Sequence, residues 1–424
     1  MQTDHAADYA NLLLGALGVS ERVAKKSDHP AIAWKRSGLL ETTKLMLPLP
    51  LAAHADGALM ALKALCPESD LPKSAAQILG ERARLRKSIR QGRLCAGGYG
   101  RLLDTQTSHI GLNLVREDDW DLIPAWLEDD VSDWDGIVKI VKGRKASSLV
   151  RRAAELGLAV AEDSFIARSK TWFSKTEFKK YAPKPRPKCK PIIVDMSSLW
   201  AGPLASSLLG MTGAEIIKIE SPARPDGMRF GHKGFYDVLN AGKACVALDF
   251  RDPTDLAQLK ALLSKADIVI EASRPRALEQ LGIVAEDYVA ENSGKVWARL
   301  TAYGRGQNRI GFGDDIGIAA GLASVMDAAH GEPCFVGDAI ADPVNGLHLA
   351  LAIYAHYKAG GGVVLDFSMQ EVLRFAMGDI TDNLDKTARD WTKIAALNAK
   401  ALYPMRHLIG ETHEVGAHNG KWLC

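Results

Sequence analysis

A regular alternation of strand and helix patterns between residues 191 and 303 constrains the fold more than any other feature. Short β-branched or apolar runs recur there, separated by loops and helical patterns, at 191–196, 214–220, 245–250, 266–273 and 295–303. Several of these runs are apolar in their centre, which indicates strands buried on both faces of a sheet. Strands that alternate with helices predict a doubly wound, mostly parallel, Rossmann-like α/β sheet.

The residues before this region show a different pattern, with longer helices and fewer strands. The expected elements are helices at 57–65, 74–89, 118–128 and 147–158, a Gly-rich segment (CAGGYG) at 95–100 and a strand at 109–115. This mixture predicts a smaller α+β domain.

A basic, proline-rich stretch, RSKTWFSKTEFKKYAPKPRPKCK, separates the two regions. It offers little apolar surface to bury, and its prolines remove backbone donors. Such a stretch is typical of an extended, solvated linker; an anion-binding segment is the alternative. The predicted organisation is a small domain at 1–167, a linker at 168–190 and an α/β domain at 191–424.

Composition and charge exclude several classes of protein. The 53 Lys and Arg and 51 Asp and Glu residues leave a net charge of +2, without the basic excess typical of nucleic-acid binders. No apolar run approaches the roughly 18 residues of a membrane-spanning helix, and the N-terminus lacks the basic start of a secretory signal. The six cysteines lie singly, so neither a metal site nor a disulfide framework is expected. We expect a cytoplasmic enzyme.

Common nucleotide and hydrolase motifs are missing. The turn after the first strand of the α/β domain, SSLWAGP, has a single glycine, Gly202, followed by Pro203, so NAD binding is disfavoured. Neither HExxH nor GxSxG occurs, which disfavours zinc proteases and α/β-hydrolases.

Two acidic helix starts are candidate sites. Asp342 lies in IADPVNGLHLALAI, where apolar residues follow at helical spacing and Pro343 fits the first helical position. Asp342 itself then fits the N-cap. Asp314 and Asp315 precede a helix of small residues in a similar way. The pattern alone favours a capping role for these acids.

Between residues 192 and 372 the chain resembles the class III coenzyme A transferases, the family of formyl-CoA:oxalate and carnitine CoA-transferases. The similar segments, in the order in which the family has them, are IIVDMSSLWAGPLASSLLGMTGAEIIKIESP, LNAGKACVALDFRDP, ADIVIEASRPRALEQLGI, GDAIADPVNGLHLALAI and GGGVVLDFSMQEV. Each segment is a weak signal, and together they are specific. The α-methylacyl-CoA racemases belong to the same superfamily.

The resemblance implies a CoA-transferase in which Asp342 is the nucleophile. The carboxylate attacks an acyl-CoA, and a mixed anhydride and then an aspartyl-CoA thioester follow, from which CoA passes to an acceptor acid. With an aqueous pKa of about 3.9, Asp342 is expected to be ionised at neutral pH. The alternatives are an acyl-CoA racemase or isomerase of the same fold and a non-catalytic CoA-binding subunit. Racemases carry a histidine before the pocket acid, where this chain has Gly313 before Asp314, or Asp314 before Asp315.

The resemblance also implies where the substrates bind. The positions that correspond to CoA contacts are Leu199, Leu248, Arg251, Ser273 and Arg274. Asp314 or Asp315 corresponds to the acid of the substrate pocket. Gly97 and Gly98 correspond to a Gly-rich loop that closes over the aspartyl intermediate.

The chain departs from the family at several positions. Ala272 and Ser273 replace an Asn–Phe pair, and Gln280 replaces a phosphate-binding arginine. The segment that resembles the family's small domain comes first, which indicates a permuted or duplicated domain order. The family's interlocked dimers imply a homodimer, with acyl-CoA and a small carboxylic acid as substrates and with neither nucleic acid nor a membrane as a partner.

Overall fold

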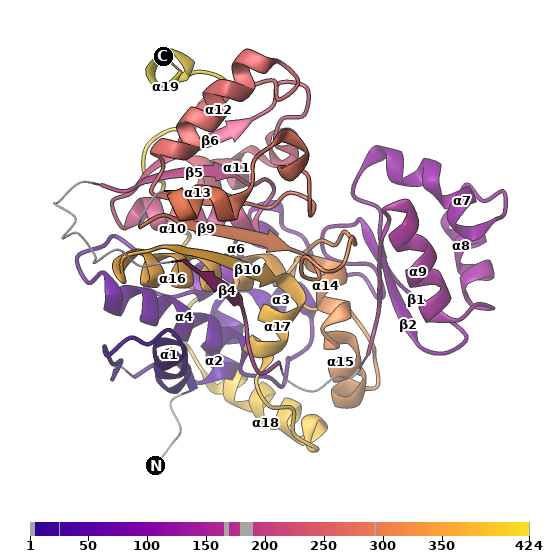
Figure 1. Cartoon of the computed structure of the whole chain (residues 1–424). Helices are drawn as coiled ribbons and strands as arrows, with labels where there is room; N and C mark the ends of the chain where they lie inside the picture. The colour runs from indigo at the N-terminus through magenta and orange to yellow at the C-terminus, as the bar shows by residue number, and fades with distance from the viewer. Residues whose placement is uncertain (1–4, 25, 165–168, 179–189, 292–293, 424) are drawn as a thin grey trace.

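A seven-stranded sheet lies at the centre of the structure, a computed structural model that describes residues 5–24, 26–164, 169–178, 190–291 and 294–423 (Figure 1). The strand order is β4-β10-β9-β8-β5-β6-β7. The strands are β4 (Ser174–Glu177), β5 (Ile192–Met196), β6 (Glu215–Glu220), β7 (Ala244–Ala247), β8 (Ile268–Glu271), β9 (Val296–Thr301) and β10 (Val363–Ser368).

The six strands from β5 to β10 pair with their neighbours in parallel, and β4 pairs with β10 in the antiparallel direction at one edge. The predicted doubly wound α/β sheet is therefore confirmed. From β5 the chain builds outward through β6 and β7, and then returns to β8 on the other side of β5. This boundary between β5 and β8 is a switch point, where sheets of this kind bind ligands at the carboxyl ends of their strands.

Two apolar cores lie on the two faces of the sheet. Neighbouring residues of β5 show this, since Ile193 packs into one core and Val194 into the other. The first core also contains α10 (Ala201–Met211) and α16 (Ala341–Lys358), and the second contains α12 (Pro253–Lys265). The other helices after residue 190 are α11 (Lys233–Asn240), α13 (Ala285–Glu291), α14 (Gly313–Ala319), α15 (Leu322–His330), α17 (Met369–Met377), α18 (Leu384–Leu397) and α19 (Asn419–Trp422).

The N-terminal helices pack into the first core of the large unit. They are α1 (His5–Ala16), α2 (Pro30–Arg36), α3 (Leu39–Thr43), α4 (Leu51–Leu65), α5 (Ala76–Leu79) and α6 (Glu81–Arg86). The hydroxyl of Tyr9 on α1 lies 2.8 Å from Nε2 of His348 on α16. Residues 5–86 therefore pack with the large sheet, and not in the small domain expected at 1–167. Helical periodicity locates an apolar face, but it does not say which partner buries that face.

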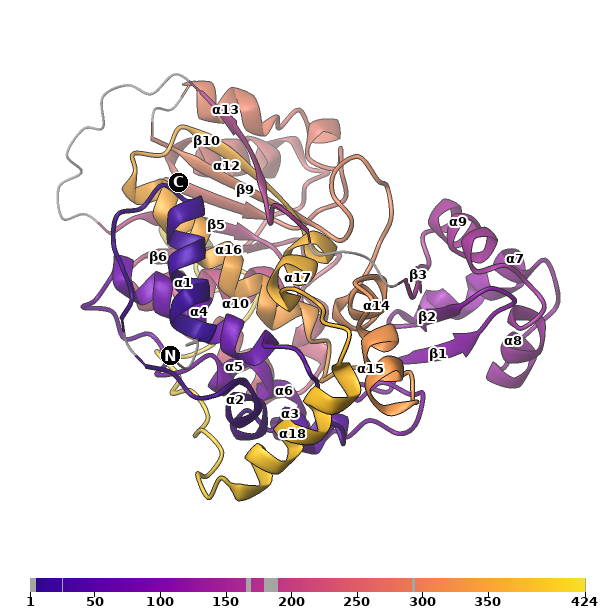
Figure 2. The ribbon, with the colours of Figure 1, turned by 90° about the horizontal axis from the view of Figure 1, so that it is seen from below.

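A small unit projects from the large one (Figures 1 and 2). Its antiparallel sheet has the order β1-β2-β3, and its helices enclose a core of their own. The elements are β1 (Gly100–Asp104), β2 (His109–Asn113), α7 (Ile123–Leu127), α8 (Trp134–Val141), α9 (Ala146–Leu156) and β3 (Ala159–Glu162). The α+β character expected for the first part of the chain is found in this unit.

The expected linker is only partly described, because residues 168 and 179–189 lie outside the described residues. Within residues 169–178 the side chains of β4 are exposed, whereas Trp172 is buried and Phe173 is half-buried. Trp172 is 2% exposed and contacts the rings of His348 and Phe367, and β4 pairs with the sheet. The aromatic pair Trp172–Phe173 supplies the apolar surface that the lysines and prolines of this stretch lack. Among the described residues, no helix has the length and apolar character needed to cross a membrane.

Candidate active site

Asp342 lies where the amino ends of three helices meet. Asp342 is half-buried, and its carboxylate accepts hydrogen bonds from the backbone N–H groups of Ala201 and Gly313, which begin α10 and α14. Its own helix, α16, begins at Ala341 and has no side-chain cap. The expected N-cap role of Asp342 is therefore wrong. The carboxylate binds the free N–H groups of two other helices, which favour a negative charge at this position.

A cluster of charged side chains surrounds Asp342. Arg82 on α6 donates from Nε to Oδ2 of Asp338 at 2.9 Å and forms a second bond from Nη2 to Oδ1. Asp314 accepts the backbone N–H of Ala339 at 2.9 Å. The charges of Asp314, Asp338 and Asp342 all act on Arg82. Three carboxylates therefore share one guanidinium.

This excess of carboxylates changes the expected ionisation of Asp342. Burial raises its pKa to about 7; Arg82 opposes the rise and Asp314 adds to it. Burial, together with the charge of Asp338, also raises the pKa of Asp314. The expectation of a fully ionised Asp342 at neutral pH is therefore wrong. The ionised form increases as the pH rises through about 7, since a carboxyl group loses its proton above its pKa.

Arg82 is fixed in place from two sides. Its guanidinium lies 4.8 Å from the centroid of the Trp200 ring. The preceding residue, Glu81, forms a buried ion pair with Arg406 at 2.6 Å. Neither Arg82 nor Asp338 was predicted from the sequence as a site residue. Nothing near Arg82 in the sequence indicates a role, because its partner Asp338 is 256 residues away.

The Gly-rich loop lies against this charged cluster. Cys95 forms a side-chain hydrogen bond with Asp314. A Cβ on Gly97 would lie 3.5 Å from Nη2 of Arg82 and 3.6 Å from Oδ1 of Asp338. Gly98 has a φ of +86° and open space around it. The structure thus places Asp342, Asp314 and Gly97 in one site.

Asp315 has a different position from Asp314. Its carboxylate accepts the backbone N–H of Phe312 at 2.8 Å, which closes the amino end of α14. It also accepts a hydrogen bond from Nδ2 of Asn113, on β2 of the small unit, at 3.1 Å. Burial raises the pKa of Asp315 to about 7. Asp315 therefore caps α14 and joins the two units, and Asp314 is the acid that faces Asp342.

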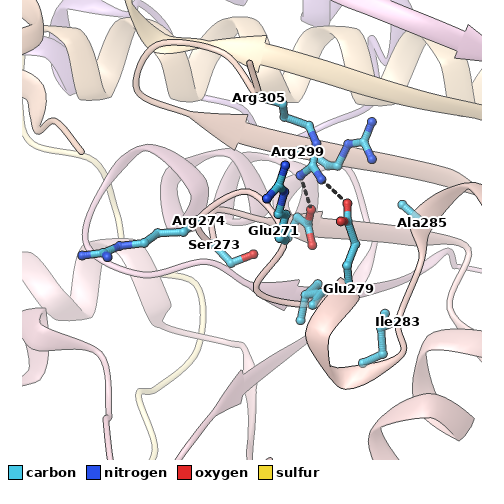
Figure 3. Close-up of a pocket in the computed structure, with 10 residues that line it drawn as sticks. Glu271, Ser273, Arg274, Glu279, Ile283, Ala285, Arg299 and Arg305 are labelled. Atoms are coloured by element: carbon cyan, nitrogen blue, oxygen red, sulfur yellow. Dashed lines mark hydrogen bonds and ion pairs between the residues drawn. The ribbon is translucent and has the colours of Figure 1, made fainter. Parts of the chain in front are cut away.

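Three of the expected CoA contacts lie at the switch point of the sheet. Leu199 follows β5 with a φ of +69°, and its backbone N–H donates to Oδ1 of Asp226 at 3.0 Å. Ser273 and Arg274 follow β8 and line a small pocket of about 10 Å³ (Figure 3). Arg274 also lines a larger cavity of about 470 Å³.

The larger cavity is rich in arginine. Its lining includes Arg274, Arg276 and Arg305, with Gln280 and Asn308 as uncharged polar members. Within the described part of the chain, Arg274 and Arg276 make no ion pair. We call this space the cationic cavity. Guanidinium groups at its wall suit phosphate groups, which accept paired hydrogen bonds from arginine.

The other two expected contacts lie away from this cavity, after the edge strand β7. The side chain of Leu248 is fully buried in the core beneath the sheet. Arg251 is 79% exposed, and its Nη2 lies 3.0 Å from Oδ2 of Asp249. The structure therefore does not bring either side chain to the cationic cavity: one is enclosed by apolar neighbours, and the other pairs with a local carboxylate.

The part of the chain that contains Asp342 is similar to known proteins. Residues 191–390 match the sequence profile described as CoA-transferase family III. Over this segment, which is slightly less than half of the chain, the protein is similar to CoA-transferase family III. The resemblance found in the sequence is thereby confirmed. The matched segment includes Asp314 and Asp342, whereas Arg82 and Gly97 lie outside it.

Several curated proteins are similar to the same part of the chain. Succinyl-CoA–D-citramalate CoA-transferase of Chloroflexus aurantiacus is 29% identical over 44% of this chain and 50% of its own length. Succinyl-CoA:glutarate CoA-transferase of Homo sapiens is 28% identical over 47% and 49%, respectively. A probable fatty acyl-CoA transferase of Mycobacterium tuberculosis is 30% identical over 45% and 50%. The chain thus spans about half the length of the curated relatives it matches.

Among solved structures, the chain is similar to a hypothetical protein from Mycobacterium tuberculosis. The identity is 31%, the match covers 46% of this chain and 58% of the other, and the TM-score is 0.41.

Proposed function

We propose that this protein transfers coenzyme A between carboxylic acids through an aspartyl-CoA thioester on Asp342. The observation that carries the proposal is the setting of that carboxylate. The residue is half-buried, and its carboxylate accepts two backbone N–H groups and lies beside one arginine. Its donor Ala201 begins the helix that follows β5, so the carboxylate belongs to the ligand-binding edge of the sheet.

The proposed reaction has two halves. In the first, an oxygen of Asp342 forms a bond to the acyl carbon of the thioester, and the C–S bond breaks to release CoA as a thiolate. The thiolate then attacks the aspartyl carbonyl carbon, and the acyl group leaves as a carboxylate that carries one oxygen of Asp342. In the second half, an acceptor carboxylate reverses these steps. The covalent intermediate divides one difficult exchange into easier steps.

The surrounding residues have separate parts in this scheme. The N–H groups of Ala201 and Gly313 stabilise the negative charge on the reacting carboxyl group. Arg82 favours the ionised form of Asp342. Gly97, which lacks a side chain, leaves room beside the cluster. The cationic cavity holds the phosphates of CoA; Arg274 lines it, and Ser273 lines the small pocket that shares Arg274 with it.

The named relatives guide the choice of substrates. Two are named for succinyl-CoA with a second carboxylic acid, and one for fatty acyl groups. We propose an acyl-CoA donor and a small carboxylic acid acceptor for this chain. The homodimer and the cytoplasmic location expected from the sequence belong to the same proposal.

A panel of exchange reactions tests the proposal. The full chain is incubated with succinyl-CoA or a fatty acyl-CoA and with isotopically labelled free acids, and label in the thioester pool is measured. Label transfer supports the proposal. Exchange of the α-proton with D₂O in place of transfer would instead favour the racemase alternative. Binding of CoA without either reaction would favour a non-catalytic subunit.

Gly313→Ala is expected to impair transfer strongly. A Cβ at this position would lie 2.2 Å from Oδ2 of Asp342 and 2.5 Å from the carbonyl oxygen of Ala339. The carboxylate or the backbone must shift, and a displacement of about 1 Å lowers the rate by about a hundredfold. The exchange assay and thermal unfolding are measured together.

Gly317→Ala on the same helix is the matched control, because the nearest atom to its new Cβ would be 3.6 Å away. That variant is expected to keep wild-type activity. Equal activity in the two variants would show that contact with Asp342 does not matter for the reaction.

A further inference from the structure

Arg305 lies between two cavities beyond the carboxyl ends of β8 and β9. It lines both the cationic cavity and the small pocket. Its Nη2 lies 2.6 Å from an oxygen of Glu279, and its Nη1 lies 3.6 Å from an oxygen of Glu271. Figure 3 shows the guanidinium directed toward both carboxylates.

The two carboxylates differ in their access to water. Glu271, the last residue of β8, is 4% exposed, whereas the side chain of Glu279 is 43% exposed. Water and salt screen an exposed ion pair, so its contribution is small. Glu271 is farther from Arg305 than Glu279 is, but its charge is screened less. At equal distance, the charge of Glu271 would therefore affect Arg305 more strongly.

The other charged groups near Glu271 are already paired. Arg299 binds Asp366 at 2.6 Å and Glu286 at 2.8 Å. Arg299 is therefore neutralised by its own two carboxylates, and Arg305 is the arginine whose positive charge Glu271 neutralises. In the cationic cavity its neighbours are Arg274 and Arg276, and Gln280 there contributes no charge.

We propose that Arg305 is an anion-binding residue of the cationic cavity and that Glu271 is its positioning residue. The ligand is a phosphate group of a CoA thioester, so the inference rests on the proposed function. An ionised Glu271 holds the guanidinium toward the small pocket and neutralises it. When Glu271 is protonated, the guanidinium is free to bind the phosphate, which then contacts Arg305 together with Arg274 and Arg276.

The structure places this change near neutral pH. Burial raises the pKa of Glu271 to about 7; Arg305 and Arg299 oppose the rise, Asp366 adds to it, and the Trp297 indole opposes it. A phosphate bound at Arg305 adds negative charge and raises that pKa further. By linkage, the affinity for CoA then falls as the pH rises through about 7. If CoA raises the pKa of Glu271 by one, the affinity falls about tenfold across this range.

Calorimetric titration of the full chain with CoA between pH 6 and pH 8.5 tests the inference. Wild type is expected to bind more weakly at the alkaline end. Glu271→Gln, which resembles the protonated acid in shape, is expected to lose this dependence and to bind about tenfold more tightly than wild type at high pH. Glu279→Gln is the matched control and is expected to keep the dependence. Thermal unfolding checks that each variant folds.

Two further titrations test which groups cause the pH dependence, one with an Arg305 variant and one with a CoA analogue. In Arg305→Met, CoA is expected to bind more weakly, and adding Glu271→Gln is expected to change nothing further. The phosphomonoester of CoA has a pKa of about 6 and titrates with the opposite sign, so 3′-dephospho-CoA serves as a second probe. The pH dependence persists with that probe if Arg305 holds the diphosphate and disappears if it holds the 3′-phosphate, and both results support the inference.

Two results would overturn it. One is a Glu271→Gln variant with the same pH dependence as wild type, and the other is an Arg305→Met variant with unchanged CoA affinity. In either case wild-type binding of CoA leaves the proposed function intact. Failure of wild type to bind CoA at every pH would overturn the proposed function together with the inference.

Discussion

Asp342→Asn is expected to abolish CoA transfer, with a fall in rate of roughly a thousandfold or more, as is typical for loss of a nucleophile. An amide does not attack a thioester, so no covalent intermediate forms. The fold is expected to survive, because the amide oxygen still accepts a backbone N–H of the kind donated by Ala201 and Gly313. Transfer is measured by the exchange of labelled acid.

Thermal unfolding of the same variant gives a second readout. A carboxyl group with a pKa raised to about 7 contributes stability that is lost as the pH rises through that value. At pH 8 the neutral asparagine is therefore expected to raise the unfolding temperature while activity is lost. Asp327→Asn, an exposed position on α15, makes the same change of charge and serves as the control. Near-normal transfer by the Asp342 variant would rule out a nucleophilic role.

Arg82→Met is expected to have the second largest effect. Arg82 opposes the rise in the pKa of Asp342, so its removal leaves three carboxylates without their shared cation. The pKa of Asp342 then rises further above 7, and less of the nucleophile is ionised at neutral pH. If the pKa rises by one, we expect the rate at neutral pH to fall about fivefold, with partial recovery at alkaline pH. The measurement is the pH profile of the transfer rate.

Two variants separate this electrostatic effect from loss of structure. Arg82→Lys keeps the charge and is expected to hold the pH profile close to that of wild type. Arg86→Met removes an exposed arginine from the same helix and is expected to be silent. A pH profile of Arg82→Met that is merely lowered, without moving along the pH axis, would contradict the proposed role of the guanidinium.

The main features of the α/β sheet were predictable because its strands are apolar over short, well-bounded runs. The predicted runs at 191–196 and 214–220 coincide closely with β5 and β6. In each case the pattern is local, and burial on both sheet faces leaves a continuous apolar run. The confirmed family resemblance falls in this same part of the chain.

The packing between distant segments was not predictable from these patterns. Trp172 lies in a stretch whose lysines and prolines indicate a linker, and yet its ring is buried in the core beside Phe367. The helices of residues 5–86 have apolar faces whose partner, the α10–α16 side of the sheet, is encoded far away in the chain. An apolar pattern predicts that a helix face is buried, but it does not predict which other segment of the chain covers that face.

The candidate site shows the same division. The family resemblance predicted Asp342, Asp314 or Asp315, and the Gly-rich loop as site residues. It did not predict the pKa of Asp342, which burial raises against the opposing charge of Arg82. Arg82 lies 256 residues from its partner Asp338, and only the fold brings the two together. For Leu248 and Arg251 the resemblance predicted CoA contacts that the side-chain positions do not support. Leu248 faces the apolar core, and Arg251 pairs with the neighbouring Asp249.

The most direct test of the proposed mechanism is to trap the intermediate on Asp342. The full chain is mixed with an acyl-CoA that supports exchange, quenched with hydroxylamine, digested and analysed by mass spectrometry. An aspartyl-CoA thioester is converted to a hydroxamate, and we predict this modification on Asp342, dependent on acyl-CoA and absent with free CoA. A chain that transfers CoA while Asp342 stays unmodified, or that carries the hydroxamate on another acid such as Asp314, would contradict the mechanism.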